Sequence, residues 1–313
     1  MNDLIKVAAA QVSPSFLNKD KTVDKACDLI KQAGLANAKL LVFPEAFISG
    51  YPDWVWLIPN SKSNDLNSLY IELVKNAVSI PDNATMQLCD AAKQAGIHVI
   101  IGINELNAES SKSSLFNSIL FINDKGNIIG KHRKLVPTGG ERLIWSQGDG
   151  STLNVFDTSL GKLSGLICWE NYMPLARNAI YALGTQILAT PTWDKSTNWI
   201  SSLQHIAREG GVFVINCCMA LKIKDIPDKY DFKKLYPQDR EWINIGNSCI
   251  INPKGEIIAG PLEAKEDILY ADIDLTQITA AKRIFDVAGH YARPDVFKFT
   301  LNQKPNNNID IID

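Results

Sequence analysis

Short apolar runs alternate with segments of helical spacing along most of the chain, and this alternation restricts the fold more than any other feature. We expect strands over residues 4–11, 40–43, 98–103, 118–122, 127–132, 162–167, 186–189, 212–216, 248–251 and 257–259. Helical spacing covers residues 20–34, much of 66–95, a segment starting at Pro174, and 200–209. The alternation favours an α/β fold with sheets covered by helices.

Composition sets the size and the class of the molecule. The 313 residues are 46% hydrophobic and 21% charged, enough to bury a large core in one domain. We expect that domain to span residues 1–297 and the Asn-rich tail, 298–313, to be partly disordered. The formal charge of -2 gives no basic surplus for binding nucleic acid or an anionic membrane.

The cellular compartment is inferred from what surrounds the cysteines and the first residues. The six cysteines include no CxxC pair, as is typical of reduced thiols rather than of a disulfide framework or a zinc site. The N-terminal residues do not resemble an export signal, and no apolar run approaches the roughly 20 residues of a membrane span. We therefore expect a cytoplasmic protein.

Three polar residues follow expected strands directly, where α/β proteins collect reactive groups. They are Glu45, Lys134 and Cys168. A helix begins near Pro174, and its N-terminal dipole together with a neighbouring lysine would favour the thiolate of Cys168. Taken singly, a buried thiol or a surface Glu or Lys is the more common explanation for each residue.

Together, these groups match the needs of attack on a carbon bound to nitrogen. A base must take the thiol proton, a cation must stabilise developing charge, and a proton must reach departing ammonia. Glu45 is the candidate base, Lys134 the electrostatic stabiliser and Glu141 a supporting carboxylate. The spacing of the residues alone does not decide between this chemistry and an ordinary core thiol.

The short sequence motifs around these residues favour the catalytic explanation over an ordinary core thiol. The relevant stretches are Phe43-Pro44-Glu45-Ala46-Phe47, residues 132–138 with Glu141-Arg142 and Trp145, Gly148-Asp149-Gly150, residues 165–177 with Cys168-Trp169-Glu170-Asn171, and residues 287–295 with Gly289-His290-Tyr291. In this order they closely resemble the nitrilase superfamily of carbon–nitrogen hydrolases, and in particular its nitrilase branch. The resemblance covers nearly the whole chain.

The resemblance implies a fold, an assembly and a reaction. The fold would be an α-β-β-α sandwich, and two subunits would pair into a four-layer homodimer that can grow into larger oligomers. The catalytic residues would be Glu45, Lys134 and Cys168, with Glu141 as the additional glutamate. The enzyme would hydrolyse an organic nitrile to the carboxylic acid and ammonia through a Cys168 thioimidate and thioester, with no cofactor and no metal.

Several residues near the reactive positions are candidates for binding the substrate. An apolar, aromatic pocket is expected from residues that follow strand ends or the cysteine: Tyr51, Trp169, Asn171, Tyr172, Thr192 and Trp193. Asn171 stands where many nitrilases have histidine, and it cannot titrate near neutrality. The preference for aliphatic, aromatic or arylacetic nitriles, the ratio of acid to amide and the oligomer size stay open.

Alternative functions for the chain would either use the same catalytic residues or use none of them. An amidase, an N-carbamoyl amide hydrolase or a cyanide-hydrolysing relative would employ the same Cys, Glu and Lys. A papain-like enzyme would need one of only four histidines beside Cys168. A silent oligomeric scaffold would keep the fold without activity, but the presence of all four polar residues speaks against it.

Overall fold

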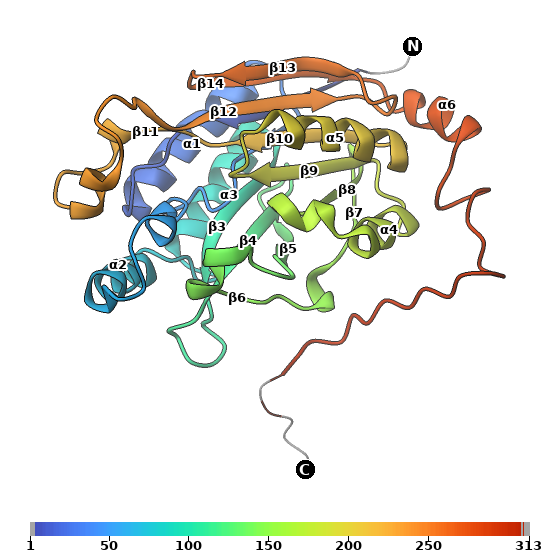
Figure 1. Cartoon of the computed structure of the whole chain (residues 1–313). Coiled ribbons are helices and arrows are strands. Elements are labelled where there is room, and N and C mark those ends of the chain that lie inside the picture. The colour runs from blue at the N-terminus through green and yellow to red at the C-terminus, as the bar shows by residue number, and fades with distance from the viewer. Residues whose placement is uncertain (1–3, 308, 310–313) are drawn as a thin grey trace.

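The structure is a computed structural model, which describes residues 4–307 and 309, and its described strands form two sheets of seven strands each (Figure 1). The first sheet has the order β14 (Asp267–Ile273), β1 (Ile5–Gln11), β2 (Leu40–Val42), β3 (His98–Leu106), β4 (Leu115–Ile122) and β5 (Ile128–Arg133), with β6 (Trp145–Ser146) beside β4. The second has the order β11 (Ala220–Lys222), β12 (Trp242–Ile251), β10 (Phe213–Cys218), β9 (Ile187–Thr192), β8 (Gly161–Gly165) and β7 (Phe156–Thr158), with β13 (Ile257–Glu263) beside β12.

Helices cover the outer face of each sheet. The helices are α1 (Lys19–Leu35), α2 (Ser63–Lys75), α3 (Asn83–Ala95), α4 (Pro174–Ala182), α5 (Thr197–Gly210) and α6 (Thr276–Ile284). Local sequence explains where several of them begin: the Asn18 side chain caps α1, Asp82 and Thr85 form a capping box at α3, and Pro174 occupies the first turn of α4. None of the described helices is both long and apolar enough to cross a membrane.

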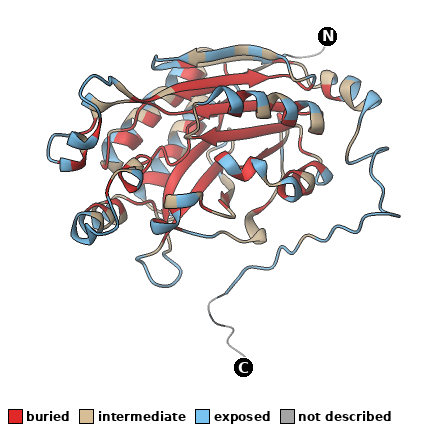
Figure 2. Ribbon diagram, in the orientation of Figure 1, coloured by how far each residue is buried: buried red, intermediate tan, exposed pale blue. Residues whose placement is uncertain are grey.

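Alternation within the strands divides the core into three layers, and the buried central strands stand out in Figure 2. On β1, Ala8 and Ala10 face α1 and α3, whereas Val7 and Ala9 face the second sheet. On β9, Leu188 packs toward α4 and α5. The order helix, sheet, sheet, helix confirms the expected α-β-β-α sandwich.

Most expected elements are present, but β6, β7, β11, β14 and α6 were not expected, and two other segments differ. The helix-rich stretch before residue 95 consists of two helices, α2 and α3, and the strand expected over 162–167 ends at Gly165. Among the strands that were not expected, β14 pairs antiparallel with β1 from Ile5 opposite Ile273 to Gln11 opposite Asp267. Strand pairing between the two ends of the chain supplies a stability that local sequence does not reveal.

The C-terminal segment runs in an extended path after α6 and returns to the body (Figure 1). Residues 298–307 contain neither helix nor strand, yet Leu301 packs on the third layer of the core and Gln303 Nε2 donates to the Leu153 carbonyl at 3.0 Å. Residues 308 and 310–313 of the expected disordered tail lie outside the described residues. The boundary at residue 297 stays a prediction.

The strand directions bring the reactive positions to one end of the sandwich. Strands β2 and β3 are parallel, and β5 runs in the same direction because both β3 and β5 are antiparallel to β4. Glu45 follows β2 and Lys134 follows β5, so both emerge at the same edge of the first sheet. Strands β8 and β9 of the second sheet are also parallel. Cys168 follows β8 and Thr192 ends β9, so both lie at the same edge of the second sheet.

Candidate active site

A buried lysine lies between two buried glutamates at the centre of the site. Lys134 Nζ is 2.9 Å from Glu45 Oε1 and 2.8 Å from Glu141 Oε2, and all three residues are at most 2% exposed. Glu141 also accepts hydrogen bonds from the Thr138 backbone N–H at 2.7 Å and from the Tyr51 hydroxyl at 2.8 Å. A buried ammonium with two hydrogen-bonded carboxylates is a fixed, preorganised charge arrangement.

Glu45 keeps one oxygen without a partner. Its Oε1 accepts from Lys134 and, at 2.7 Å, from Asn117 Nδ2, whereas its buried Oε2 has no hydrogen-bond partner among the described residues. Burial and the nearby Glu141 carboxylate raise the pKa of Glu45, although the Lys134 ammonium opposes them. A carboxylate with a raised pKa and an unused oxygen is suited to act as a general base.

Cys168 occupies a strained turn after β8. Its φ angle is +52°, in the left-handed region that non-glycine residues rarely adopt, and it opens the short 3₁₀ helix Cys168–Tyr172. The Asn171 side chain holds this turn, because its Nδ2 donates to the carbonyl oxygens of Leu166 at 2.8 Å and Cys168 at 2.9 Å. The turn presents the Cys168 thiol to the cavity in front of it.

Burial favours the thiol form of Cys168 over the thiolate. Burial, followed by the Glu45 carboxylate, raises the pKa of Cys168 to about 12, although Lys134 opposes the change. The sequence had suggested a thiolate stabilised by the following helix; in the structure, loss of solvent outweighs that effect. The nucleophile therefore requires a base to remove its proton.

Glu170 joins the segments that carry Lys134 and Cys168. The Glu170 carboxylate is buried and accepts from the backbone N–H groups of Leu135 and Ile167, each at 2.8 Å. His132 Nε2 lies 2.9 Å from both carboxylate oxygens. Leu135 and Ile167 are the neighbours of Lys134 and Cys168, so one carboxylate fixes the two reactive segments relative to each other.

We expect Glu170→Gln to lower the free energy of unfolding by about 2–3 kcal/mol near pH 5.5, because a buried charged pair loses one member. Burial alone would lower the pKa of His132, but Glu170 outweighs burial and raises it above 6.5. His132 and the backbone donors outweigh burial at Glu170 and lower its pKa below 4.5. Between pH 4.5 and pH 6.5 the pair thus stabilises the fold fully. The effect of the substitution declines as the pH rises through the raised pKa of His132.

Urea unfolding of the wild type and Glu170→Gln at several pH values measures this difference. The matched control is Glu109→Gln, which removes a carboxylate that is 74% exposed and is expected to change stability by less than about 1 kcal/mol. A pH-independent loss of stability in Glu170→Gln would contradict the ionic pair.

Gly102 allows the Glu45 segment to pass close over the first sheet. A Cβ atom at Gly102 would lie 2.1 Å from the Pro44 carbonyl oxygen and 2.6 Å from the Ala46 backbone nitrogen. The segment is tied down at this point, because the Ile48 N–H donates to the Gly102 carbonyl at 3.0 Å. A side chain at residue 102 would displace the backbone that carries the base.

Gly102→Ala should therefore lower the free energy of unfolding by about 1–3 kcal/mol and also reduce turnover per folded molecule, since Glu45 moves. Thermal unfolding and initial rates measure the two effects. Gly96→Ala is the control: its Cβ would meet open space at a φ of +63°, so it should cost about 1 kcal/mol without a change in turnover. Full activity of folded Gly102→Ala would contradict the role assigned to this close approach.

A cavity of about 340 Å³ opens in front of Cys168. Tyr51 and Trp193 stack in its wall with ring centroids 4.4 Å apart, and the exposed Trp169 ring is held by a hydrogen bond of 2.8 Å from its Nε1 to Asp194 Oδ2. The other lining residues are Trp56, Thr138, Glu141 and Ser196. An apolar aromatic enclosure beside a nucleophile suits a small uncharged substrate.

The six expected substrate-binding residues divide into two groups. Tyr51, Trp169 and Trp193 line the cavity. Asn171 and Thr192 are fully buried behind it, and Tyr172 lies outside its lining, where its hydroxyl is 3.2 Å from Ser202 Oγ. Their contact with substrate stays a prediction.

Further residues shape the site without having been predicted from the sequence. Asn117 binds Glu45, His132 binds Glu170, and Trp56 donates to the Tyr51 hydroxyl at 3.2 Å. Glu170 and His132 stand within recognisable stretches of the sequence, but Asn117 lies in the middle of a strand with no local signal. No group of three His, Cys, Asp or Glu side chains that could hold a metal ion occurs in the described part of the chain.

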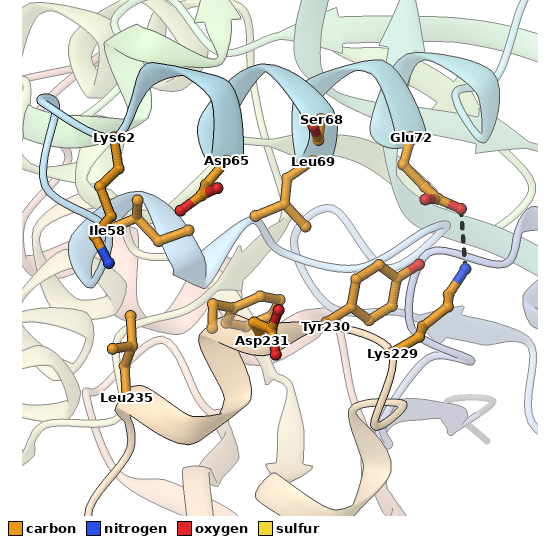
Figure 3. A pocket seen from close by; sticks show the side chains of 11 residues that line it. Ile58, Lys62, Asp65, Ser68, Leu69, Glu72, Lys229, Tyr230, Asp231 and Leu235 are labelled. Carbon is orange, nitrogen blue, oxygen red and sulfur yellow. Dashed lines mark hydrogen bonds and ion pairs between the residues drawn. The ribbon is translucent and has the colours of Figure 1, made fainter.

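A second hollow, of about 310 Å³, lies between α2 and the segment 229–235 (Figure 3). Leu69 and Tyr230 face each other across it, and an ion pair of 3.1 Å between Lys229 and Glu72 spans one end. It contains none of the reactive residues, so the cavity at Cys168 is the candidate active site.

Comparisons with known proteins identify the family of the chain. The sequence profile of the family "Carbon-nitrogen hydrolase" matches residues 6–283. The chain is 39% identical to Nitrilase 1 of Arabidopsis thaliana, over 98% of this chain and 90% of that protein, and 37% identical to an aliphatic nitrilase of Sinorhizobium fredii, over 96% of each. The crystal structure of Saccharomyces cerevisiae Nit3 superposes with a TM-score of 0.72 at 22% identity, covering 92% of this chain and 96% of that one, which supports the fold. The chain belongs to the carbon–nitrogen hydrolase family.

Proposed function

We propose that the chain is a nitrilase, which hydrolyses an organic nitrile to the carboxylic acid and ammonia, with Cys168 as nucleophile and Glu45, Lys134 and Glu141 as its partners. The observation that carries this proposal is the buried Glu45–Lys134–Glu141 group, whose Glu141 lines the same cavity as Cys168. The identity of 37% to 39% with nitrilases over nearly the whole chain supports the same reaction.

The first half of the reaction forms a covalent intermediate. Glu45, through its unpartnered Oε2, takes the Cys168 proton as the sulfur adds to the nitrile carbon. The nitrile nitrogen takes up this proton, and a thioimidate results. Lys134 beside the reacting atoms stabilises the negative charge that builds on nitrogen during the addition.

The second half releases ammonia and then the acid. Water adds to the thioimidate carbon and gives a tetrahedral centre that bears sulfur, hydroxyl and amino groups. Glu45 takes the hydroxyl proton and passes a proton to the amino group, so that ammonia leaves as the carbonyl forms and a thioester remains. A second water, deprotonated by Glu45, displaces Cys168 as the thiol and releases the carboxylic acid. The steps balance with water as the sole co-substrate, so this mechanism needs no cofactor.

Glu141 keeps Lys134 charged and in place. Burial alone would lower the pKa of Lys134, but the carboxylates of Glu45 and Glu141 raise it instead. The Thr138 N–H and the Tyr51 hydroxyl hold Glu141 in turn. We infer that Glu141 positions the lysine, while the aromatic wall with Trp193 receives the organic group of the nitrile.

The proposal is tested by incubating the purified enzyme with aliphatic, aromatic and arylacetic nitriles and with the matching amides, and by separating acid, amide and ammonia. Preferential conversion of nitriles to acids is the expected result. Turnover of the amides alone would assign the same residues to an amidase and overturn the nitrilase proposal.

We further propose that the enzyme works as a homodimer or larger homo-oligomer in a reducing compartment such as the cytoplasm. Large apolar side chains stay exposed along the C-terminal segment: Phe285, Tyr291, Val296, Phe297 and Phe299. Their burial between subunits would remove apolar surface from water. All six cysteines are free thiols, which fits a reducing compartment. Light scattering at several protein concentrations measures the assembly, and a monomer throughout would contradict it.

A further inference from the structure

Thr192 is in direct contact with the nucleophilic sulfur. It is the last residue of β9, it is fully buried, and its Oγ1 lies 3.1 Å from Cys168 Sγ. The sequence placed Thr192 among the substrate-binding residues, but the hydroxyl points to the sulfur and is absent from the cavity lining. Its chemical effect must therefore pass through Cys168.

The hydrogen bonds around Thr192 fix which atom donates. The backbone N–H of Asp194 donates to Thr192 Oγ1 at 2.9 Å, so the oxygen already accepts a hydrogen bond. The described residues offer no second acceptor for the Thr192 hydroxyl besides Cys168 Sγ. The hydroxyl hydrogen is thus directed at the sulfur.

The Thr192 hydroxyl stabilises the Cys168 sulfur whenever that sulfur carries negative charge. Hydrogen bonds to a charged partner are stronger than those to a neutral one, so this contact stabilises the thiolate relative to both the thiol and the thioether. In the reaction, sulfur becomes negative twice: when Cys168 is deprotonated for attack, and whenever the carbon–sulfur bond breaks.

The tetrahedral intermediate can break in two ways. If the protonated amino group leaves as ammonia, the thioester forms and acid is the final product. If the carbon–sulfur bond breaks instead, sulfur leaves with the electron pair, the hydroxyl loses its proton to Glu45 as the carbonyl forms, and the product is the amide. Glu45 then returns that proton to the thiolate, which restores the resting enzyme.

We propose that the Thr192 hydroxyl sets the ratio of amide to acid, because its hydrogen bond to Cys168 Sγ makes sulfur a better leaving group in the tetrahedral intermediate. The inference rests on the proposed nitrilase function. It makes Thr192 a catalytic residue, in contact with a reacting atom, and gives it a role in product choice.

The first test is independent of nitrile turnover. Iodoacetamide alkylation of Cys168, followed by mass spectrometry of its peptide across pH 7–10, reports how readily the thiolate forms. Thr192→Val keeps the branched shape but removes the donor, and should slow alkylation roughly tenfold to a hundredfold at a given pH. Thr192→Ser, which keeps the hydroxyl, should react like the wild type. Equal rates in wild type and Thr192→Val would overturn the hydrogen bond to sulfur.

The second test measures products from the same nitriles. The wild type should release some amide with the acid, and Thr192→Val should lower the ratio of amide to acid by about tenfold, with Thr192→Ser restoring it. Thr190→Val is the matched control, since its buried hydroxyl lies two residues earlier on β9 and is 3.5 Å from Asn216 rather than near sulfur. It should leave the ratio unchanged.

The outcomes separate this inference from the nitrilase proposal. A wild type that converts no nitrile overturns the proposed function, whereas the alkylation result still decides whether Thr192 binds the sulfur. An active wild type that makes no amide, or a Thr192→Val protein with an unchanged ratio of amide to acid, overturns the role in product choice. Circular dichroism of each variant verifies that the fold is retained.

Discussion

Replacement of Cys168 by alanine is expected to reduce ammonia release from nitriles by about 10⁴-fold or more, to the level of a blank. No other described side chain of the cavity lining is a thiol, and the reaction proposed above has no path without a covalent intermediate. Because alanine fills nearly the same space, the free energy of unfolding should change by about 1 kcal/mol or less.

The control for this loss is Cys27→Ala, which removes a half-buried thiol on α1. It should retain full activity, so that any general effect of losing a cysteine is excluded. Rates of ammonia release and thermal unfolding are measured for both variants. Activity within about tenfold of the wild type in a folded Cys168→Ala protein would refute the covalent mechanism.

Lys134→Met is expected to have the largest effect on stability. It leaves Glu45 and Glu141 buried without their shared cation, which should lower the free energy of unfolding by about 3–5 kcal/mol at neutral pH and remove turnover. In this variant, burial raises the pKa of Glu45 in the folded state without the opposing effect of Lys134. The deficit should therefore shrink as the pH falls and the carboxyl groups become protonated.

Urea unfolding at about pH 5 and about pH 8 tests this dependence. Adding Glu45→Gln to Lys134→Met should recover part of the lost stability without restoring turnover, because one buried charge is removed along with the base. The control Lys162→Met breaks an exposed pair with Asp157, 3.4 Å apart, and should cost less than about 1 kcal/mol at either pH. An equal deficit at both pH values in Lys134→Met would contradict the buried carboxylate pair.

The candidate reactive groups could be proposed from the sequence because each stands in a short, recognisable motif. Glu45 follows an apolar run closed by proline, and Cys168 lies between a strand and the helix that starts at Pro174. The sequence predicted their chemical state less well. The pKa of Cys168 depends on the water that the two sheets exclude, and the lone Oε2 of Glu45 depends on where Lys134 and Asn117 lie in space.

The same distinction holds for the fold. Alternation on β1 and amphipathic spacing on α1 are local patterns, so the helices and central strands could be read directly. Strand β14 has a weaker pattern of burial and owes its conformation to β1, more than 250 residues earlier, as the pairing of Ile5 with Ile273 shows. Long-range pairing of this kind has no signal within a short window.

The sequence by itself determined the residue types of the site and the order of strands and helices that delivers them, because both are encoded within a few neighbouring positions. Tertiary structure alone decided the left-handed turn at Cys168, the close passage of the Glu45 segment over Gly102 and the contact of Thr192 with sulfur. The turn depends on hydrogen bonds from Asn171, and the other two contacts join neighbouring strands of one sheet. All three depend on distances of a few ångströms that are fixed only when the chain packs.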